Sequence, residues 1–298
     1  MAATVKDYLK LHFIVVLWGF TAILGMEIAM PTTDVVLYRT GMAAVALLFL
    51  MKIRKQSIKL EKVDLIKILF TGMIVATHWV LFFEAARVST VSVCLAGMAT
   101  VTFWTSLLEP LLGKRKIKGF EVGLGLVAIV GLYIIFQFEF NNALGLTLAI
   151  IAAFLSAFFY VLNSQYTKKH SPYVITFYEM IGACITLLIF IPIYQAFILE
   201  TPVEYAVPSL RDFGFLLVLS LACTVYAFAQ SVELMRRISA FMVNLSINLE
   251  PIYGIIMAVL IYGEKEKMSA GFYWGTLIIL ASVLSYPALN RYFTKPKH

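Results

Sequence analysis

The chain repeats itself at a spacing of about half its length. Arg87-Val88-Ser89 is followed 150 positions later by Arg237-Ile238-Ser239, and the same spacing joins three identical pairs: Val93 and Val243, Gly113 and Gly263, Gly125 and Gly275. A second match, Tyr38-Arg39 with Tyr178-Glu179, has a spacing of 140. A long internal repeat predicts a fold built from two copies of one unit.

Each copy consists of apolar stretches of membrane length. Charged residues make up 14% of the chain, against about 25% in soluble domains. A bilayer-spanning helix needs about 20 apolar residues, and ten stretches approach this length: Leu11–Met30, Val35–Met51, Leu65–Ala86, Val91–Leu112, Gly119–Phe136, Leu144–Leu162, Tyr173–Ile198, Phe213–Val232, Ala240–Ile261 and Phe272–Leu289.

These stretches are continuously apolar rather than alternating, which favours helices over barrel strands. We therefore predict an all-α integral membrane protein with ten transmembrane helices, arranged as two five-helix repeats. An odd number of spans inverts the second copy relative to the first. The repeats are expected at residues 1–137 and 138–298, separated near the short polar stretch Gln137–Asn142.

Basic residues predict the orientation. With a cytoplasmic N-terminus, 19 of the 24 lysines and arginines lie on the inner side and four lie outside, while Arg39 falls within a helix. Cytoplasmic loops carry the excess of positive charge, so both termini are expected in the cytoplasm and the chain in the inner membrane. The net charge of +7 then indicates contact with the lipid bilayer and requires no nucleic acid.

Glycine spacing predicts where the fifth and tenth helices meet a neighbour. Gly119 and Gly123, and Gly271 and Gly275, lie four residues apart, and such pairs let helix backbones approach closely. We favour packing within one chain, with a homodimer contact as the alternative.

The sequence resembles the EamA-type branch of the drug/metabolite transporter superfamily. The resemblance rests on Leu17-Trp18-Gly19, Arg39, the run Phe82–Ser89, and Pro251 followed by Gly263-Glu264. It implies ten helices, an inverted pseudo-two-fold axis, a central cavity, and export or exchange of small solutes. The first half departs from the pattern, because Val101 stands where the second half has the proline and Lys114 where it has the acidic residue.

Polar residues inside the apolar stretches are the candidate site. An ionisable side chain at bilayer depth costs about 2.5–3.5 kcal/mol on insertion scales, and polar stripes along one helix face indicate either a watery cavity or hydrogen bonds between helices. We favour the cavity. The proline would disturb the ninth helix, and Glu250 would join the cavity only if that helix unwinds; otherwise it pairs elsewhere or carries a proton. The predicted substrate-binding residues are His78, Trp79, Trp104, Tyr160, Asn163, Tyr226, Gln230, Asn244, Asn248 and Glu250.

Three charged residues predict gates at the two membrane faces. Glu27 and Arg39 flank the turn Pro31–Thr33, so an ion pair between them would offset the burial of each and form an outer gate. Asn163 and Glu179 occupy the matching hairpin of the second half and predict an inner gate. The alternative is that Arg39 and Glu179 reach toward the nearest water.

The predicted function is secondary transport of a small metabolite by alternating access, with an amino acid or similar amphipathic solute as substrate. An exporter of drugs or organic cations is the alternative, with Glu250 as partner of the cation. The sequence has no paired aspartate motif and no Gly-rich phosphate loop, so we expect neither enzymatic activity, nor a metal, nor another cofactor. A channel is a further alternative, distinguished by flux without counterflow.

Overall fold

The chain folds as a bundle of membrane-length helices. The computed structural model describes residues 3–113, 118–138, 140–247 and 249–294, and every regular element in this part is helical. Within the described residues, eight helical stretches are long and apolar enough to cross a bilayer, and two shorter apolar helices, Gly119–Ile135 and Ala270–Ser282, accompany them. The protein is therefore an all-helical, multi-pass membrane protein.

In the first half, two of the predicted spans are broken into consecutive helices. The elements in chain order are α1 (Val5–Gly19), α2 (Thr21–Glu27), α3 (Thr32–Ile53), α4 (Lys62–Val88), α5 (Val91–Met98), α6 (Val101–Gly113) and α7 (Gly119–Phe138).

A 3₁₀ turn, η1 (Phe140–Asn142), leads into the second half. The elements that follow are α8 (Ala143–Tyr166), α9 (Pro172–Phe197), α10 (Leu210–Ser220), the π-helix η2 (Leu221–Tyr226), α11 (Ala227–Leu234), α12 (Ala240–Ile247), α13 (Glu250–Tyr262), the 3₁₀ turn η3 (Gly263–Glu266), α14 (Ala270–Leu284) and α15 (Tyr286–Thr294).

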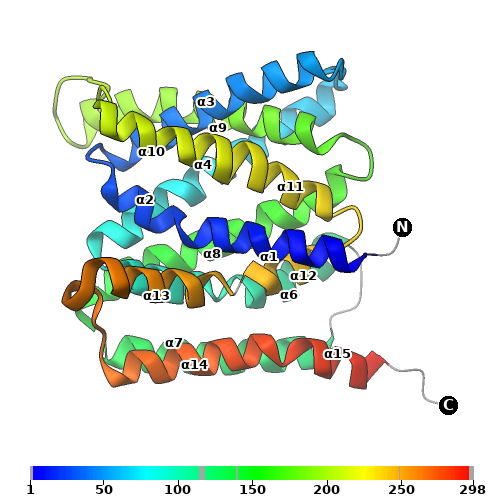
Figure 1. The fold of residues 1–298 in the computed structure, drawn as a ribbon, viewed down its shortest axis with the longest axis vertical. Coiled ribbons are helices and arrows are strands. Elements are labelled where there is room, and N and C mark those ends of the chain that lie inside the picture. The colour runs from blue at the N-terminus through cyan, green and yellow to red at the C-terminus, as the bar shows by residue number, and fades with distance from the viewer. Residues whose placement is uncertain (1–2, 114–117, 139, 248, 295–298) are drawn as a thin grey trace.

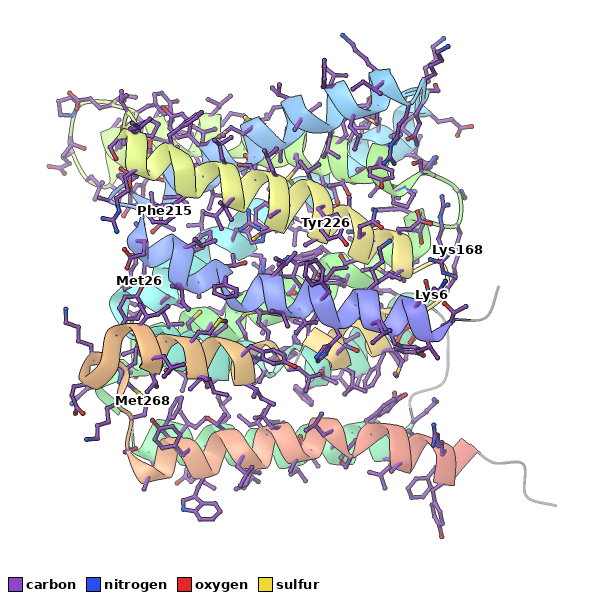
Figure 2. All side chains as sticks on the ribbon, viewed as in Figure 1. Lys6, Met26, Lys168, Phe215, Tyr226 and Met268 are labelled. Atoms are coloured by element: carbon purple, nitrogen blue, oxygen red, sulfur yellow. The ribbon has the colours of Figure 1, made fainter. Side chains whose placement is uncertain are left out.

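The helices run side by side between two ends of the bundle (Figure 1). The start of α1 and the end of α15 lie at one end, called here the terminal end (Figure 1), where Lys6 and Lys168 are also found (Figure 2). Met26, Phe215 and Met268 lie at the other, the opposite end. The α7 and α14 pair forms one edge of the bundle, and α4 packs extensively on α8 and α9 in its interior.

Two glycines bring α7 and α14 together within the chain. A Cβ at Gly131 would lie 2.6 Å from the carbonyl oxygen of Gly275, and a Cβ at Gly275 would lie 2.6 Å from that of Gly131. Gly275 thus makes the predicted close approach, but its partner is Gly131, because Gly119 and Gly123 face open space. The bare surface of both glycines lets the two backbones touch.

The fourth and ninth predicted spans are interrupted at equivalent places. Helices α5 and α12 each have 8 residues, and helices α6 and α13, which follow them, each have 13. The four pieces pack crosswise, α5 against α13 and α6 against α12. Pro251 lies in the first turn of α13, where its missing N–H removes no helical hydrogen bond. The proline therefore starts a new helix after the break.

Close packing of α4 against α9 depends on one glycine from each helix. A Cβ added at Gly72 would overlap the carbonyl oxygen of Glu179, and a Cβ added at Gly182 would overlap that of Leu69. Both obstacles are backbone atoms, which cannot rotate away as a side chain could. This contact fixes the separation of the two helices that meet at the centre of the bundle.

Gly182→Ala is expected to destabilise the protein by about 1–3 kcal/mol through overpacking, more than the roughly 1 kcal/mol that alanine contributes to helix propensity. Gly214→Ala is the matched control, because nothing lies within 4 Å of a Cβ at that helical position. Thermal unfolding of the two purified variants in detergent measures the difference. An unfolding temperature for Gly182→Ala equal to or above that of Gly214→Ala would contradict the packing argument.

Candidate functional site

A small cavity lies between the two halves of the chain. Its volume is about 50 Å³, enough for a few water molecules at about 10–15 Å³ of such volume each. Both halves line it in nearly equal measure, and every lining residue is buried: Trp18, Thr21, Arg39, His78, Trp79, Phe82, Met98, Ser156, Phe159, Tyr160, Phe228, Ile247 and Glu250. The cavity is thus shielded from both ends of the bundle.

Arg39 of α3 places a guanidinium group in this apolar interior. The residue is 1% exposed, and its Cζ lies 3.8 Å from the centroid of the Trp79 ring, a distance suited to a cation–π interaction. Its Nε donates a hydrogen bond of 2.8 Å to Oγ1 of Thr224. Its Nη1 has no hydrogen-bond partner among the described residues. One edge of the guanidinium is therefore held by the protein, and the other retains an unused donor.

The π-helix η2 supplies the acceptor for Arg39. Thr224 lies within η2, and its hydroxyl also donates to the carbonyl of Leu219, five residues earlier, at 2.9 Å. In the same segment the Cys223 carbonyl accepts a 3.0 Å hydrogen bond from Nε1 of Trp18. π-helical turns widen a helix and occur often at functional sites. Here the turn directs polar groups of the second half toward Trp18 and Arg39 of the first.

Glu250 brings a carboxylate to the same cavity from the second half. It is the first residue of α13 and is 7% exposed. The sequence predicts that Glu250 can reach the cavity only if its helix is interrupted, and the structure meets this condition, since a new helix begins at Glu250 with Leu249 as its N-cap. Arg39 and Glu250 make no direct ion pair within 4.0 Å among the described residues, although both line the cavity.

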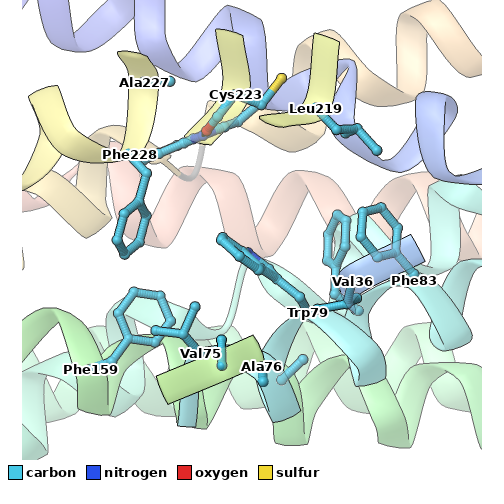
Figure 3. Packing of buried hydrophobic residues seen from close by; sticks show 14 of the residues in the cluster. Val36, Val75, Ala76, Trp79, Phe83, Phe159, Leu219, Cys223, Ala227 and Phe228 are labelled. Carbon is cyan, nitrogen blue, oxygen red and sulfur yellow. The ribbon is translucent and has the colours of Figure 1, made fainter. Parts of the chain in front are cut away.

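Aromatic rings form the apolar wall of the cavity. Phe228 from α11 and Phe159 from α8 point toward Trp79 of α4 (Figure 3). The centroid distances are 5.9 Å from Trp79 to Phe228 and 5.8 Å from Phe159 to Phe228, and Tyr160 lies in a stacked contact with Phe159 at 4.7 Å. The sequence predicted Trp79 and Tyr160 but missed the two phenylalanines, which carry no polar signal that sets them apart from lipid-facing residues.

His78 also lines the cavity, where it is held by the backbone of the second half. Its Nδ1 lies 2.8 Å from the carbonyl oxygen of Ala152, and its ring meets that of Phe159 at 5.4 Å between centroids. The carbonyl contact fixes the orientation of the imidazole. His78 therefore contributes a fixed edge to the cavity and ties α4 to α8.

Several other predicted site residues lie outside the cavity. Trp104 packs between Phe103 and Phe154, and the Asn244 amide donates a 2.7 Å hydrogen bond to Thr105 Oγ1. This hydrogen bond between the polar stripes of the fourth and ninth spans joins α6 to α12, in line with the alternative of hydrogen bonds between helices. Tyr226 is 40% exposed on the bundle surface (Figure 2).

Two further predicted substrate-binding residues are Gln230 and Asn248, of which Gln230 is not among the residues that line the cavity. Gln230 lies toward the terminal end, where it accepts a hydrogen bond from Lys10 and donates one of 2.7 Å to the Tyr173 hydroxyl. Asn248 lies outside the residues that the structure describes.

The predicted contact between Glu27 and Arg39 is not formed, so that part of the prediction is wrong. Glu27 forms an ion pair with Arg211 and accepts a 3.0 Å hydrogen bond from the Tyr262 hydroxyl. The guanidinium of Arg39 instead extends to Thr224 and Trp79. Glu27 pairs with Arg211 of the second half because α10, which carries Arg211, packs beside α2 at the opposite end.

Asn163 and Glu179, the residues of the predicted inner gate, lie close to each other in the second half. Both are fully buried, and the amide of Asn163 lies near the carboxylate of Glu179. They contact each other from α8 and α9, outside the group of residues that lines the cavity.

A shielded cavity between repeated halves of a polytopic membrane bundle is the architecture of a membrane transport protein. The chain belongs to the EamA-like transporter family, whose pattern it matches twice, over residues 8–137 and 143–286. This confirms the resemblance drawn from the sequence motifs.

Solved structures share the fold, and 28 of their chains match. One of them, a crystal structure, aligns with a TM-score of 0.69 at 13% sequence identity. The alignment covers 96% of this chain and 99% of the other. No curated protein matches the sequence. The structural match therefore supports the fold and says nothing of the solute.

Thr224→Val is expected to destabilise the protein by about 1.5–3 kcal/mol, because it leaves a buried charged donor, the Nε of Arg39, without its acceptor. Thr77→Val is the matched control, since Thr77 is exposed on α4 and its hydroxyl bonds only to the Met73 carbonyl of its own helix. The unfolding temperatures of the two variants in detergent measure the difference, and equal values would contradict the role of Thr224.

Proposed function

We propose that the protein is a secondary carrier of the cytoplasmic (inner) membrane. It moves a small zwitterionic solute, an amino acid or a similar amphipathic metabolite, by alternating access, as an exporter or facilitator. We further propose ten transmembrane helices in two inverted five-helix repeats, with both termini in the cytoplasm.

The observation that carries the choice of solute is the presence of opposite charges in one shielded cavity. The unused Nη1 donor of Arg39 suits a carboxylate, for which guanidinium is a preferred partner. Glu250 suits an ammonium group, and the rings of Trp79, Phe159 and Phe228 suit an apolar side chain. These three features match the three parts of an apolar α-amino acid.

The size of the cavity and the contacts at its two ends support alternating access. At about 50 Å³ the cavity is too small for an amino acid, so the halves must separate to admit one. At the terminal end Asp7 pairs with Arg237 at 2.9 Å and Lys10 bonds to Gln230. At the opposite end Glu27 pairs with Arg211.

All of these pairs join the first span to the eighth span or the segment that follows it. In our proposal they are the gates: the α1 side opens at the terminal end and the α2 side at the opposite end, one at a time. Glu27 keeps the gating role predicted from sequence, with a new partner, whereas Arg39 becomes a binding residue.

The equal lengths of the broken helices support the inverted repeat. α5 with α6, and α12 with α13, are interrupted after the same number of residues and pack crosswise. The basic residues support the orientation, because the positive-inside rule places the lysine-rich terminal end in the cytoplasm.

The second candidate function is export of an organic cation. Glu250 would pair with the cation, and the aromatic rings would cover its apolar part. Arg39 disfavours this function, because its fixed charge repels a cation in the same cavity. An intramembrane enzyme would be identified by formation of a chemical product. A channel would be identified by solute flux without exchange.

Counterflow in proteoliposomes tests the proposal. Vesicles containing the purified chain are loaded with apolar amino acids, and entry of a labelled amino acid is followed with three competitors: the amino acid, the corresponding amine and the corresponding carboxylic acid. We expect saturable exchange that only the zwitterion inhibits strongly. Loss of one charge-assisted hydrogen bond costs about 1.5–3 kcal/mol, so Arg39→Gln and Glu250→Gln should weaken binding by roughly ten- to a hundredfold.

Tyr226→Phe is the matched control and should exchange as the wild type does, because Tyr226 faces away from the cavity. Equal inhibition by the amine and the amino acid would contradict the zwitterion and favour the organic cation. Flux without exchange would contradict the carrier.

A further inference from the structure

A second group of buried polar side chains lies apart from the cavity. Asn163 on α8 and Thr176 and Glu179 on α9 are each 0% exposed. Both carboxylate oxygens of Glu179, both amide atoms of Asn163 and the Thr176 hydroxyl lack a hydrogen bond of regular geometry among the described residues, although the Asn163 amide lies beside the Glu179 carboxylate. Most buried polar groups in proteins are hydrogen-bonded, so a cluster of this kind indicates a ligand that occupies it.

The position of Glu179 is fixed by its own backbone. Gly72 of α4 packs directly on the carbonyl oxygen of Glu179, so the backbone of Glu179 cannot move away from the interior unless α4 and α9 separate, and in this arrangement the residue is 0% exposed. An uncompensated charge in such surroundings is strongly unfavourable. In this arrangement the carboxylate therefore has to be neutralised.

In the part of the chain that the structure describes, no positive side chain is available for that purpose. The titratable groups that face Glu179 are the phenols of Tyr160 and Tyr166 on α8. Among the described residues, α3, α4 and α11, which also pack on α9, place no charged group beside it. The group that neutralises Glu179 must therefore come from solution.

We propose that Glu179 and Asn163 form a proton-binding site of the carrier. A proton from solution bonds to one carboxylate oxygen of Glu179, and the resulting O–H donates to the amide oxygen of Asn163. Neutralisation by a metal ion fits less well, since hard cations take about six oxygen ligands and three side chains supply too few.

The repeat gives this site a place in the transport cycle. Glu179 occupies the position in the second half that Arg39 occupies in the first, at a spacing of 140. One copy carries a permanent charge in the cavity, and the other carries a charge that a proton can remove. In a carrier of the kind proposed above, on which this step rests, opening of the end nearest Glu179 lets the proton leave, so that solute and proton movements are coupled.

Infrared spectroscopy of the purified full-length chain tests the site without any solute. We expect the carbonyl-stretch band of a protonated carboxylic acid at neutral pH, reduced in Glu179→Gln by the contribution of one group and unchanged in Glu61→Gln, which makes the same change at an exposed position. Asn163→Leu, which removes the acceptor, should shift the band and gives an independent reading if Glu179→Gln does not fold. A band unchanged by both substitutions, or abolished by sodium chloride but not by choline chloride, would overturn the proposal.

Proteoliposome transport then tests the coupling. With a pH-sensitive dye inside the vesicles, wild-type solute flux should be accompanied by proton movement. Glu179→Gln should retain counterflow while its proton movement falls to the level of protein-free vesicles. Proton movement that persists in a Glu179→Gln variant active in counterflow would overturn the coupling. If no tested solute exchanges, the carrier proposal fails, whereas the infrared result still decides whether Glu179 binds a proton.

Discussion

Burial of the Arg39 guanidinium constrains the centre of this structure more than any other interaction. A charged side chain at bilayer depth costs about 2.5–3.5 kcal/mol on insertion scales, and here it is surrounded by aromatic rings. The protein offsets part of this cost with the face of Trp79 and the hydroxyl of Thr224. The π-helix in the eighth span positions that hydroxyl, and the break in the ninth span brings Glu250 to the same cavity. The π-helix and the helix break of the second half thus both place polar groups near Arg39 of the first half.

The same arrangement explains why the cavity lies between the halves. Regular helices would present their polar groups to one another, as α6 and α12 do through Thr105 and Asn244. Where the helices are interrupted, this pairing ends and charged groups face a shared space. Discontinuous helices at the interface of repeats are a recurrent way to build solute sites in membranes. In the carrier that we propose, binding and movement are coupled, because opening either end would separate the surfaces that hold the solute.

Much of the fold followed from the sequence because its signals are strong. The repeat at a spacing of 150 and the length of the apolar stretches predict the helices, and the cost of buried charge identifies Arg39 and Glu250 as residues of interest. Helix periodicity, however, gives only the face of a residue on its own helix and not the neighbour that it meets. For this reason periodicity predicts Tyr226 and Gln230 in the cavity and pairs Glu27 with Arg39, whereas in the structure Gln230 bonds to Tyr173 and Glu27 pairs with Arg211. The π-helix was missed because its segment Leu221–Tyr226 reads as an ordinary apolar helix.

The central claim is that the cavity opens to one side of the membrane at a time, and accessibility of Met98 measures it most directly. Met98 lines the cavity from α5, and Cys94, Cys184 and Cys223 can be replaced by alanine to give a background without thiols. In that background, Met98→Cys should react slowly with an impermeant maleimide applied to either side of the vesicle, and saturating solute should slow the reaction from both sides. Fast labelling from both sides at once would indicate an open pore, and labelling unaffected by an exchanged solute would place the binding site elsewhere.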